Sequence, residues 1–600
     1  MLAKTLTILA IIYLVTGTKD QFHNFDSFYD TGIKPRFSIE DLGATNLGPE
    51  EEKGSTFWIN KAQESLREKV TNKPLIKRAK NVIFFIGDGL SIATMTAARI
   101  YDSQGKGNPW GEENILSFEK LPYSGQVKTY CTNAQVADSA CTATAYHTGV
   151  KTSLGSIGVN ANVSFFDCAA SSDSVNQVDS ILKLAQDSCK STGIVTTTKV
   201  THASPAPLYA HSAFRDWEAD TDIEKFGIDP STCQDIASQL VNNSPGNKIN
   251  VVLGGGRGRF LPKELNDENG VPGLRGDGQD LISKWKADHP QGRYVSNKVD
   301  LLNAQKENGV TDLLGLFQLS HMDYYDNSNK DTQPSLTDMT EAAIELLSKN
   351  SNGFYLFVEG GHIDSAHHDN KLRHSLRETT QFARAIERTL ELINLEETLV
   401  VVSSDHSHTV GIAGYPKRGN DIVGLADPTR DSKNLPYTSM NYMFGPKQYR
   451  DENGERIDLT NTFASPDMNL IYPSMTPATD NYHAGDDVAI FAAGPYAHLF
   501  TGVLNQNVIP EMMSFAACLG NDLTHCKLFN IPSDTCEISS TKCDSSVDLD
   551  WRAVRGVCTD FKVCAGNTWL QLSCPNGLMF KESIGFCVRD AALCPESLLI

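Results

Sequence analysis

The sequence predicts an α/β fold, a three-layer αβα sandwich around a central, mostly parallel sheet, followed by a small disulfide-rich β domain. Short apolar runs rich in Val, Ile and Phe, such as NVIFFIGDG and TLVVVSSDHSH, end in Gly or an acid, as strands buried on both faces do. The stretches between them have helical periodicity, as in residues 375–393, where apolar residues recur at spacings of three or four or their multiples. Seven of the fourteen cysteines fall in residues 536–594, which indicates a disulfide-stapled module.

Composition divides the 600 residues into five parts. Residues 1–17 hold one lysine, an apolar run too short to span a bilayer and then small residues, so we expect a cleaved signal peptide rather than a buried strand or helix. Residues 18–52 form a polar lead-in, and residues 53–528 form the large α/β domain. A linker, 529–542, leads into the cysteine-rich domain, 543–600.

Charge and export signals limit the classes of partner. The net charge is −20, from 53 basic and 73 acidic residues, which argues against a nucleic-acid or anionic-membrane binder because either needs a basic face. The C-terminal residues carry no hydrophobic tail of the kind that a lipid-anchor signal requires. The cysteines and two sequons, at Asn162 and Asn242, fit a secreted glycoprotein without a membrane anchor.

Acids and histidines gather at the ends of predicted strands. The four groups are Asp88; Glu359, Asp364 and His368; Asp405 and His406; and His483. Any one of these residues is more often a helix cap or another structural polar group, but four such groups together indicate metal sites. Nitrogen and carboxylate donors suit zinc, and all-oxygen donors suit magnesium. Two zinc ions would bind the attacking and the leaving oxygen in an in-line displacement at phosphorus.

That displacement needs a nucleophile, and the stretch QVADSACTATA offers Asp138, Ser139 and Cys141 as candidates. Ser139 is the candidate, because the metal groups would activate it. Cys141 has no dedicated base beside it in the sequence, so we interpret it as a packing residue or a disulfide partner of Cys131. The same small side chains would also suit a tightly packed helix start.

Five segments resemble the motifs of the alkaline phosphatases, in particular the animal secreted and surface enzymes. They are QVADSACTATAY, THASPAPLYAHSAFRDW, VEGGHIDSAHH, SSDHSH and HAGDDVAIFA, and the similarity extends from about residue 57 to residue 526. The resemblance implies hydrolysis of phosphate monoesters through a phosphoserine, with two zinc ions and one magnesium ion in each subunit. It also implies a homodimer in which the helix containing FWINKAQESL packs across the two subunits.

Carried over position by position, the resemblance assigns roles to these residues. Ser139 would be the nucleophile, Arg215 would hold the phosphate, and Asp138 would orient its surroundings through Arg215. One zinc ion would bind Asp364, His368 and His483, the other Asp88, Asp405 and His406, and magnesium would bind Asp88, Ser204 and Glu359, with His202 in its outer shell.

Two departures from the family pattern have expected consequences. Ser365 stands where the family usually has a histidine, so a contact near the phosphate is altered. Gln318 and Gln333 replace two acids of an additional calcium site found in animal members. Because neutral amides bind calcium poorly, we expect that site to be lost.

The C-terminal domain resembles the peritrophin-A type of chitin-binding domain, both in its cysteine spacing and in the stretch CPNGLMF. Six cysteines alone allow fifteen pairings. The resemblance implies Cys543 with Cys564, Cys558 with Cys594 and Cys574 with Cys587, and in the large domain Cys168 with Cys233 and Cys518 with Cys526. Cys131, Cys141, Cys189 and Cys536 stay unassigned. Phe561, Trp569 and Trp551 are candidates for stacking on sugar rings, or they form the domain's own core.

The sequence therefore predicts a secreted, zinc- and magnesium-dependent phosphomonoesterase held on chitinous extracellular matrix. One alternative is a structural protein of the matrix with weakened catalysis, and another is a sulfatase or phosphodiesterase of related fold. The intact set of metal ligands, with Ser139 and Arg215, argues against the structural protein. The nucleophile segment lacks the Cys/Ser-x-Pro-x-Arg pattern that a sulfatase needs. We interpret GGGRGRF, residues 254–260, as a turn, and His211, His321 and His408 as local or outer-shell residues.

Overall fold

The structure is a computed structural model that describes residues 49–412, 414–427, 429–520 and 526, together with the backbone of five short strands between residues 551 and 588. The chain divides into two compact units between Cys526 and Lys527. The predicted signal peptide, most of the polar lead-in and the predicted linker lie outside the described residues. Among the helices that are described, none has the length and apolar character needed to cross a bilayer.

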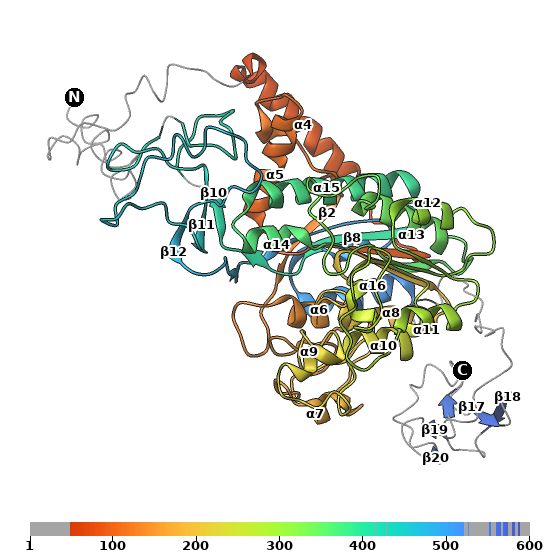
Figure 1. Ribbon diagram of the computed structural model, residues 1–600. Helices are drawn as coiled ribbons and strands as arrows, with labels where there is room; N and C mark the ends of the chain where they lie inside the picture. Colours follow the sequence, from red (N-terminus) through yellow and green to blue (C-terminus); the bar gives the residue numbers. More distant parts are fainter. Residues whose placement is uncertain are drawn as a thin grey trace, which may run out of the picture. The chain divides into compact units, whose positions relative to one another are not determined.

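A ten-stranded sheet forms the centre of the large unit (Figure 1). In spatial order its strands are β15 (Gly502–Asn505), β2 (Tyr123–Lys128), β14 (Val488–Ala493), β8 (Thr398–Ser404), β1 (Asn81–Gly87), β7 (Phe354–Gly360), β3 (Ser191–Lys199), β4 (Val251–Gly255), β6 (Leu313–Leu316) and β5 (Arg293–Val295). Only the two pairs that β14 makes, with β8 and β2, are antiparallel. Every residue of β7 and β8 is buried, which explains why these strands are continuous apolar runs.

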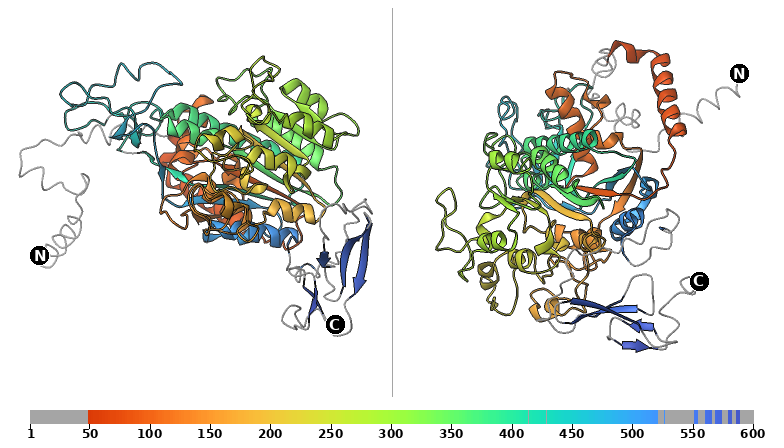
Figure 2. Two further views of the ribbon diagram at one scale, coloured as in Figure 1. Left: turned by 60° about the horizontal axis from the view of Figure 1, so that its bottom comes forward. Right: turned by 90° about the vertical axis from the view of Figure 1, so that its right-hand side faces the viewer.

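Helices cover both faces of the sheet (Figure 2). On one face, α5 (Ile92–Gly105), α13 (Leu336–Leu347) and α15 (Leu372–Leu392) pack together, and on the other lie α6 (Ser139–Thr148), α8 (Ile181–Asp187) and α16 (Ile509–Ala517). The periodic residues of α15 point to the core, where Phe382 meets Phe85 of β1 with ring centroids 6.0 Å apart. The predicted three-layer αβα sandwich is confirmed.

Shorter elements complete the large unit. The helices are α7 (Cys168–Ser172), α9 (Asp220–Glu224), α10 (Ile236–Asn242), α11 (Leu281–Asp288), α12 (Lys298–Ala304) and α14 (His362–His368), and the strands are β9 (Ser407–His408), β10 (Val410–Ile412), β11 (Met440–Gly445), β12 (Ser474–Pro477) and β13 (His483–Ala484). Helix α4 (Ser55–Thr71) differs from the others, since none of its residues is buried. It extends beyond the body of the unit (Figures 1 and 2).

Three disulfides join pairs of described cysteines in the large unit. They join Cys131 to Cys141, Cys168 to Cys233 and Cys518 to Cys526. The last two are the pairs that the resemblance implies, and the first is the pairing that the residues alone left open. Cys189 is also disulfide-bonded.

The smaller unit contains two antiparallel sheets, consistent with a small β domain. Strands β16 (Trp551–Ala553), β17 (Asp560–Ala565) and β18 (Thr568–Ser573) form one, and β19 (Met579–Lys581) with β20 (Phe586–Val588) forms the other. The cysteine side chains of this unit, and so its three expected disulfides, lie outside the described residues.

Candidate active site

Four adjacent parallel strands, β8, β1, β7 and β3, end at the same edge of the sheet and bring distant acids together. Asp88 follows β1, Asp405 follows β8, and Glu359 is the penultimate residue of β7. In the register of the sheet, Glu359 is paired with Ile86, two residues before Asp88. All three carboxylates are fully buried. The topology thus converts three separate sequence segments into one acidic centre.

The first group consists of Asp88, Asp405 and His406. Nε2 of His406 lies 3.1 Å from Oδ2 of Asp405 and 3.4 Å from Oδ1 of Asp88. Both carboxylate oxygens of Asp88 and Oδ2 of Asp405 are buried without a hydrogen-bond partner. Burial and the neighbouring carboxylates raise the pKa of Asp88, and burial lowers that of His406 to about 3. Unpaired carboxylates beside a neutral imidazole fit a bound zinc ion.

The residue after Asp88 has to be glycine. Gly89 has a φ of +68°, and a Cβ atom there would lie 2.6 Å from the ring of His408. Its N–H donates to Oδ1 of Asp405 at 2.9 Å, so this carboxylate directs its other oxygen at His406.

The second group consists of Asp364, His368, His408 and His483, whose ligating atoms lie within 4.8 Å of one another. Asp364 and His368 are one turn apart on α14, with Nε2 and Oδ2 separated by 3.4 Å. Nδ1 of His368 donates to the carbonyl of Asn481 at 2.7 Å, and Nδ1 of His483 donates to that of Ala137 at 2.8 Å. These bonds turn both Nε2 lone pairs toward the same point, since the two Nε2 atoms are 3.1 Å apart.

His408 has a different role, which follows from its tautomer. The side-chain amide of Asn481 donates to Nδ1 of His408 at 2.9 Å, and the orientation of that amide is supported by Thr409, whose hydroxyl donates to its oxygen. Nε2 of His408 therefore carries the proton and donates to Oδ1 of Asp364 at 2.5 Å. His408 therefore orients the Asp364 carboxylate and has no free lone pair on Nε2.

The third group is built around Glu359. Thr196 and Thr198 donate to its Oε2 at 2.5 and 3.2 Å, while its Oε1 is buried without a partner. The Ser204 hydroxyl is likewise buried and unpartnered, and the ligating atoms of Asp88, His202 and Glu359 lie within 4.8 Å of one another. Burial raises the pKa of Glu359 to about 7. Oxygen atoms without partners fit a magnesium ion.

Ser139 begins helix α6 and is 1% exposed. Its Oγ lies 3.1 Å from Nε2 of His406, within reach of the first metal group. Asp138 is the N-cap of the helix, and its Oδ2 accepts from Nη1 of Arg215 at 3.0 Å. Burial raises the pKa of Asp138, but Arg215 and two backbone N–H groups outweigh burial and lower it. Nη2 of Arg215 reaches Nε2 of His202 at 3.3 Å.

Sequence reasoning missed several residues that orient this centre. Asn481 lies in the NYHAGDD stretch, where only His483 was singled out, and it contacts two of the histidines. The N–H of Gly155 donates to the Asp138 carboxylate at 3.1 and 3.2 Å. Backbone donors of this kind leave no signal in the sequence, because every residue type except proline supplies one.

The remaining features of interest lie around the centre. Residues 254–260, which the sequence predicts as a turn, end β4 and continue into a short 3-10 helix, Arg257–Phe260, in which Arg257 pairs with Asp267 at 2.6 Å. The ring of His321 meets that of His202 edge to face, with centroids 5.3 Å apart, and its Nδ1 is buried without a hydrogen-bond partner. His211 donates to the carbonyl of Gly158 at 2.6 Å, which is a local contact.

The two sequons differ in setting. Asn162 is exposed in a turn. Asn242 ends helix α10, and its amide donates to Oγ of Ser238 at 3.0 Å.

Carboxylates and imidazoles at the carboxyl edge of a mostly parallel, doubly covered sheet are the donor set that suits a metal-dependent enzyme of the α/β class. The family described as "Alkaline phosphatase" matches residues 79–519, and the "Chitin binding Peritrophin-A domain" matches residues 543–594. The membrane-bound alkaline phosphatase of Bombyx mori is 42% identical over 489 residues, which cover 80% of this chain and 88% of that protein. The tissue-nonspecific isozyme of Homo sapiens is 43% identical over 490 residues, covering 80% and 92%.

Solved structures agree on the fold. The alkaline phosphatase of Thermus thermophilus has a TM-score of 0.53 at 22% identity, covering 78% of this chain and 95% of that one. The alkaline phosphatase of the Antarctic bacterium TAB5 has a TM-score of 0.51 at 22% identity, covering 74% and 99%. The chain belongs to the alkaline phosphatase family and carries a C-terminal chitin-binding domain of the peritrophin-A type.

Proposed function

We propose that the chain is a secreted, zinc- and magnesium-dependent phosphomonoesterase that is held on chitinous matrix and works through a phosphoserine at Ser139. The observation that carries this proposal is the Ser139 hydroxyl, 3.1 Å from His406 in a metal-binding group. Ser139 directly follows Asp138, whose carboxylate accepts from Arg215 at 3.0 Å.

The chain's own groups divide the work of phosphoryl transfer. When bound, zinc would lower the pKa of the serine hydroxyl and neutralise the leaving oxygen, and magnesium would complete the site around Glu359. Oγ of Ser139 loses its proton and attacks phosphorus, and the ester P–O bond breaks so that the alcohol leaves with a proton. Water then attacks the phosphoserine, which releases phosphate and restores the Ser139 hydroxyl. Asp138 and His202 engage two of the five N–H groups of Arg215, leaving three to bind phosphate oxygens.

Direct hydrogen bonds support our proposal that the calcium site is absent. Nε2 of Gln318 donates to Oε1 of Gln333 at 3.1 Å and to Oδ2 of Asp323 at 2.8 Å. Nε2 of Gln333 donates to the carbonyl of Asp323 at 3.1 Å. Gln318 thus donates to Gln333, and both amides donate to Asp323, where two carboxylates in their place would need a cation.

The strand register of the small unit supports a division of roles between the chitin candidates. Phe561 is paired with Leu572, and Cys564 with Trp569. Since successive residues alternate between faces, Phe561 and Trp569 occupy opposite faces. By register, Val563 shares a face with Phe561, and Gln571 shares one with Trp569. We infer from this sequence pattern that Trp569 is the better candidate for stacking on chitin.

Exposed apolar residues on α4 support a homodimer. Trp58, Ile59, Leu66 and Val70 are 44%, 54%, 62% and 73% exposed. A helix with this composition and no buried residue would gain stability by packing against a second subunit. Light scattering should give a dimer mass, and Leu66→Glu with Val70→Glu should shift it to the monomer.

The enzyme proposal is tested by release of p-nitrophenol from its phosphate ester at alkaline pH by protein loaded with zinc and magnesium. We expect turnover that Ser139→Ala lowers more than about a thousandfold. Ser514→Ala, which alters another buried serine on a helix, should keep full activity. No turnover by the loaded chain, or full activity of Ser139→Ala, would contradict the proposal.

Chitin beads test the matrix proposal separately. The full chain should be retained, and a chain without residues 543–600 should pass through with its phosphatase activity intact. Equal retention of the two forms would contradict the chitin tether.

A further inference from the structure

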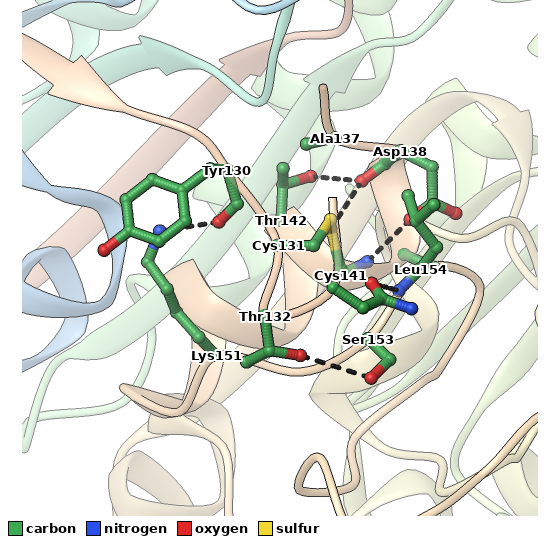
Figure 3. The surroundings of a disulfide bond; sticks show 12 residues. Tyr130, Cys131, Thr132, Ala137, Asp138, Cys141, Thr142, Lys151, Ser153 and Leu154 are labelled. Carbon is green, nitrogen blue, oxygen red and sulfur yellow. Dashed lines mark hydrogen bonds between the residues drawn. A yellow bond between two sulfur atoms is a disulfide. The ribbon is translucent and has the colours of Figure 1, made fainter. Parts of the chain in front are cut away.

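A disulfide encloses the segment that carries both Asp138 and Ser139. Cys131 and Cys141 are bonded to each other with their Cα atoms 5.9 Å apart, and their side chains are 3% and 2% exposed (Figure 3). The bond links the segment that follows β2 to the first turn of α6. The nucleophile therefore lies inside a covalently closed loop of the chain.

Cys141 also contacts Asp138 through the backbone. Oδ1 of Asp138 accepts from the N–H of Cys141 at 3.2 Å and from that of Gly155 at 3.1 Å. Oδ2 of Asp138 accepts from Nη1 of Arg215 at 3.0 Å. Three separate segments thus hold one carboxylate, and the disulfide anchors one of them.

The other end of the disulfide is anchored on the segment that contains Gly155. Nζ of Lys151 donates to the carbonyl of Tyr130 at 2.7 Å and lies 3.4 Å from the centre of its ring (Figure 3). The N–H of Leu154 donates to Oδ1 of Asn133 at 3.0 Å. The bond at Cys131 therefore ties α6 to the same segment that supplies the Gly155 N–H to Asp138.

We propose that the Cys131–Cys141 disulfide positions the Asp138 carboxylate, and through it Arg215, to bind the phosphate group of the substrate. The inference rests on the proposed phosphatase function. Without the bond, the first turn of α6 and the segment before it gain freedom, as helix ends do. Asp138 then loses its fixed contacts, and misplacement of a binding group by about 1 Å costs up to about a hundredfold in rate. The two cysteines are positioning residues, because they act through Asp138.

The test compares two disulfide deletions of similar loop length. Cys131→Ala with Cys141→Ala removes a disulfide between cysteines 10 residues apart, and Cys518→Ala with Cys526→Ala removes one between cysteines 8 residues apart. Both proteins are loaded with zinc and magnesium, their metal content is measured, and p-nitrophenyl phosphate kinetics are recorded with inorganic phosphate as inhibitor. We expect the first variant to raise KM and the inhibition constant of phosphate about tenfold, with a smaller change in kcat. The second should leave both constants unchanged.

A double-mutant cycle separates positioning from general stability. In an Asp138→Ala background, removal of Cys131 and Cys141 should weaken phosphate binding no further. A similar loss in both backgrounds, or no loss in the native background, would overturn the proposal. If the native chain, loaded with metal, has no activity at all, the proposed function itself fails.

A second measurement applies if the disulfide-free variant does not fold. The native enzyme is treated with graded tris(2-carboxyethyl)phosphine in zinc-containing buffer, and thiols at Cys131 and Cys141 are quantified by alkylation and mass spectrometry. The inhibition constant of phosphate should rise with the reduced fraction and recover on reoxidation. Reduction of this bond without change in phosphate binding would overturn the proposal.

Discussion

Replacing His408 with alanine removes the N–H group that orients Asp364 but leaves the three proposed zinc ligands of the second group in place. The lost bond joins Nε2 to Oδ1 at 2.5 Å, and His408 is 1% exposed, so water does not readily replace it. Loss of such an outer-shell partner typically lowers metal affinity 10- to 100-fold, which corresponds to about 1.4 to 2.7 kcal/mol.

Zinc-buffered dialysis measures this loss directly. The zinc content and the p-nitrophenyl phosphatase activity of each variant are followed against free zinc concentration. The curve for His408→Ala should move to zinc concentrations about 10 to 100 times higher, and full activity should return at saturation. His368→Ala, which removes a proposed ligand, should not recover. An unshifted curve for His408→Ala, or a loss that saturating zinc does not reverse, would refute the assigned role of His408.

Asn481→Leu provides an internal check on the same reasoning. The variant keeps the backbone carbonyl that accepts from His368 but loses the amide that donates to Nδ1 of His408. Its zinc curve should shift less than that of His408→Ala, and the double variant should match His408→Ala alone. Additive shifts would mean that Asn481 does not act through the tautomer of His408.

Three further outcomes are expected. Adding or chelating calcium should leave the thermal midpoint of the native chain unchanged, because Gln318 and Gln333 bond to each other. The double variant Gln318→Glu with Gln333→Asp should have a calcium-dependent midpoint. Calcium dependence of the native chain would contradict this expectation. Burial lowers the pKa of Lys190 from 10.5 to about 7. Between pH 7 and pH 10.5 unfolding therefore takes up a proton, so the free energy of unfolding rises with pH, by up to about 1.4 kcal/mol per pH unit. Urea unfolding at several pH values should show that Lys190→Met flattens the rise of the unfolding free energy with pH. An unchanged rise would argue against a neutral Lys190. Trp569→Ala should reduce retention on chitin beads more than Phe561→Ala does in correctly folded protein, and the reverse order would contradict the assigned faces.

The sheet and its acidic edge could be predicted from sequence because the pattern is local. Asp88 and Asp405 each follow a continuous apolar run, and parallel strands place such residues at one edge whatever the order of the strands. The three-layer fold followed from the same runs and from the periodicity of the segment that became α15. These features need no knowledge of which segments are neighbours.

Features that depend on contacts between distant segments could not be predicted. The proton on Nε2 of His408 is set by Asn481, 73 residues away, and spacing cannot indicate which way that amide points. The pairing of Cys131 with Cys141 stayed open because ten residues of separation allow either a bond or simple packing. Phe561 and Trp569 appeared equivalent as aromatics until the strand register assigned them to different faces.

The central claim, that Ser139 carries the phosphoryl group, is tested most directly by trapping it. The metal-loaded protein is incubated with inorganic phosphate, quenched in acid and digested, and the peptide that contains Ser139 is examined by mass spectrometry. The account predicts covalent phosphate on Ser139, absent when metal is removed and absent in Ser139→Ala. Phosphate on another residue, or turnover of p-nitrophenyl phosphate without any phosphoserine at Ser139, would contradict it.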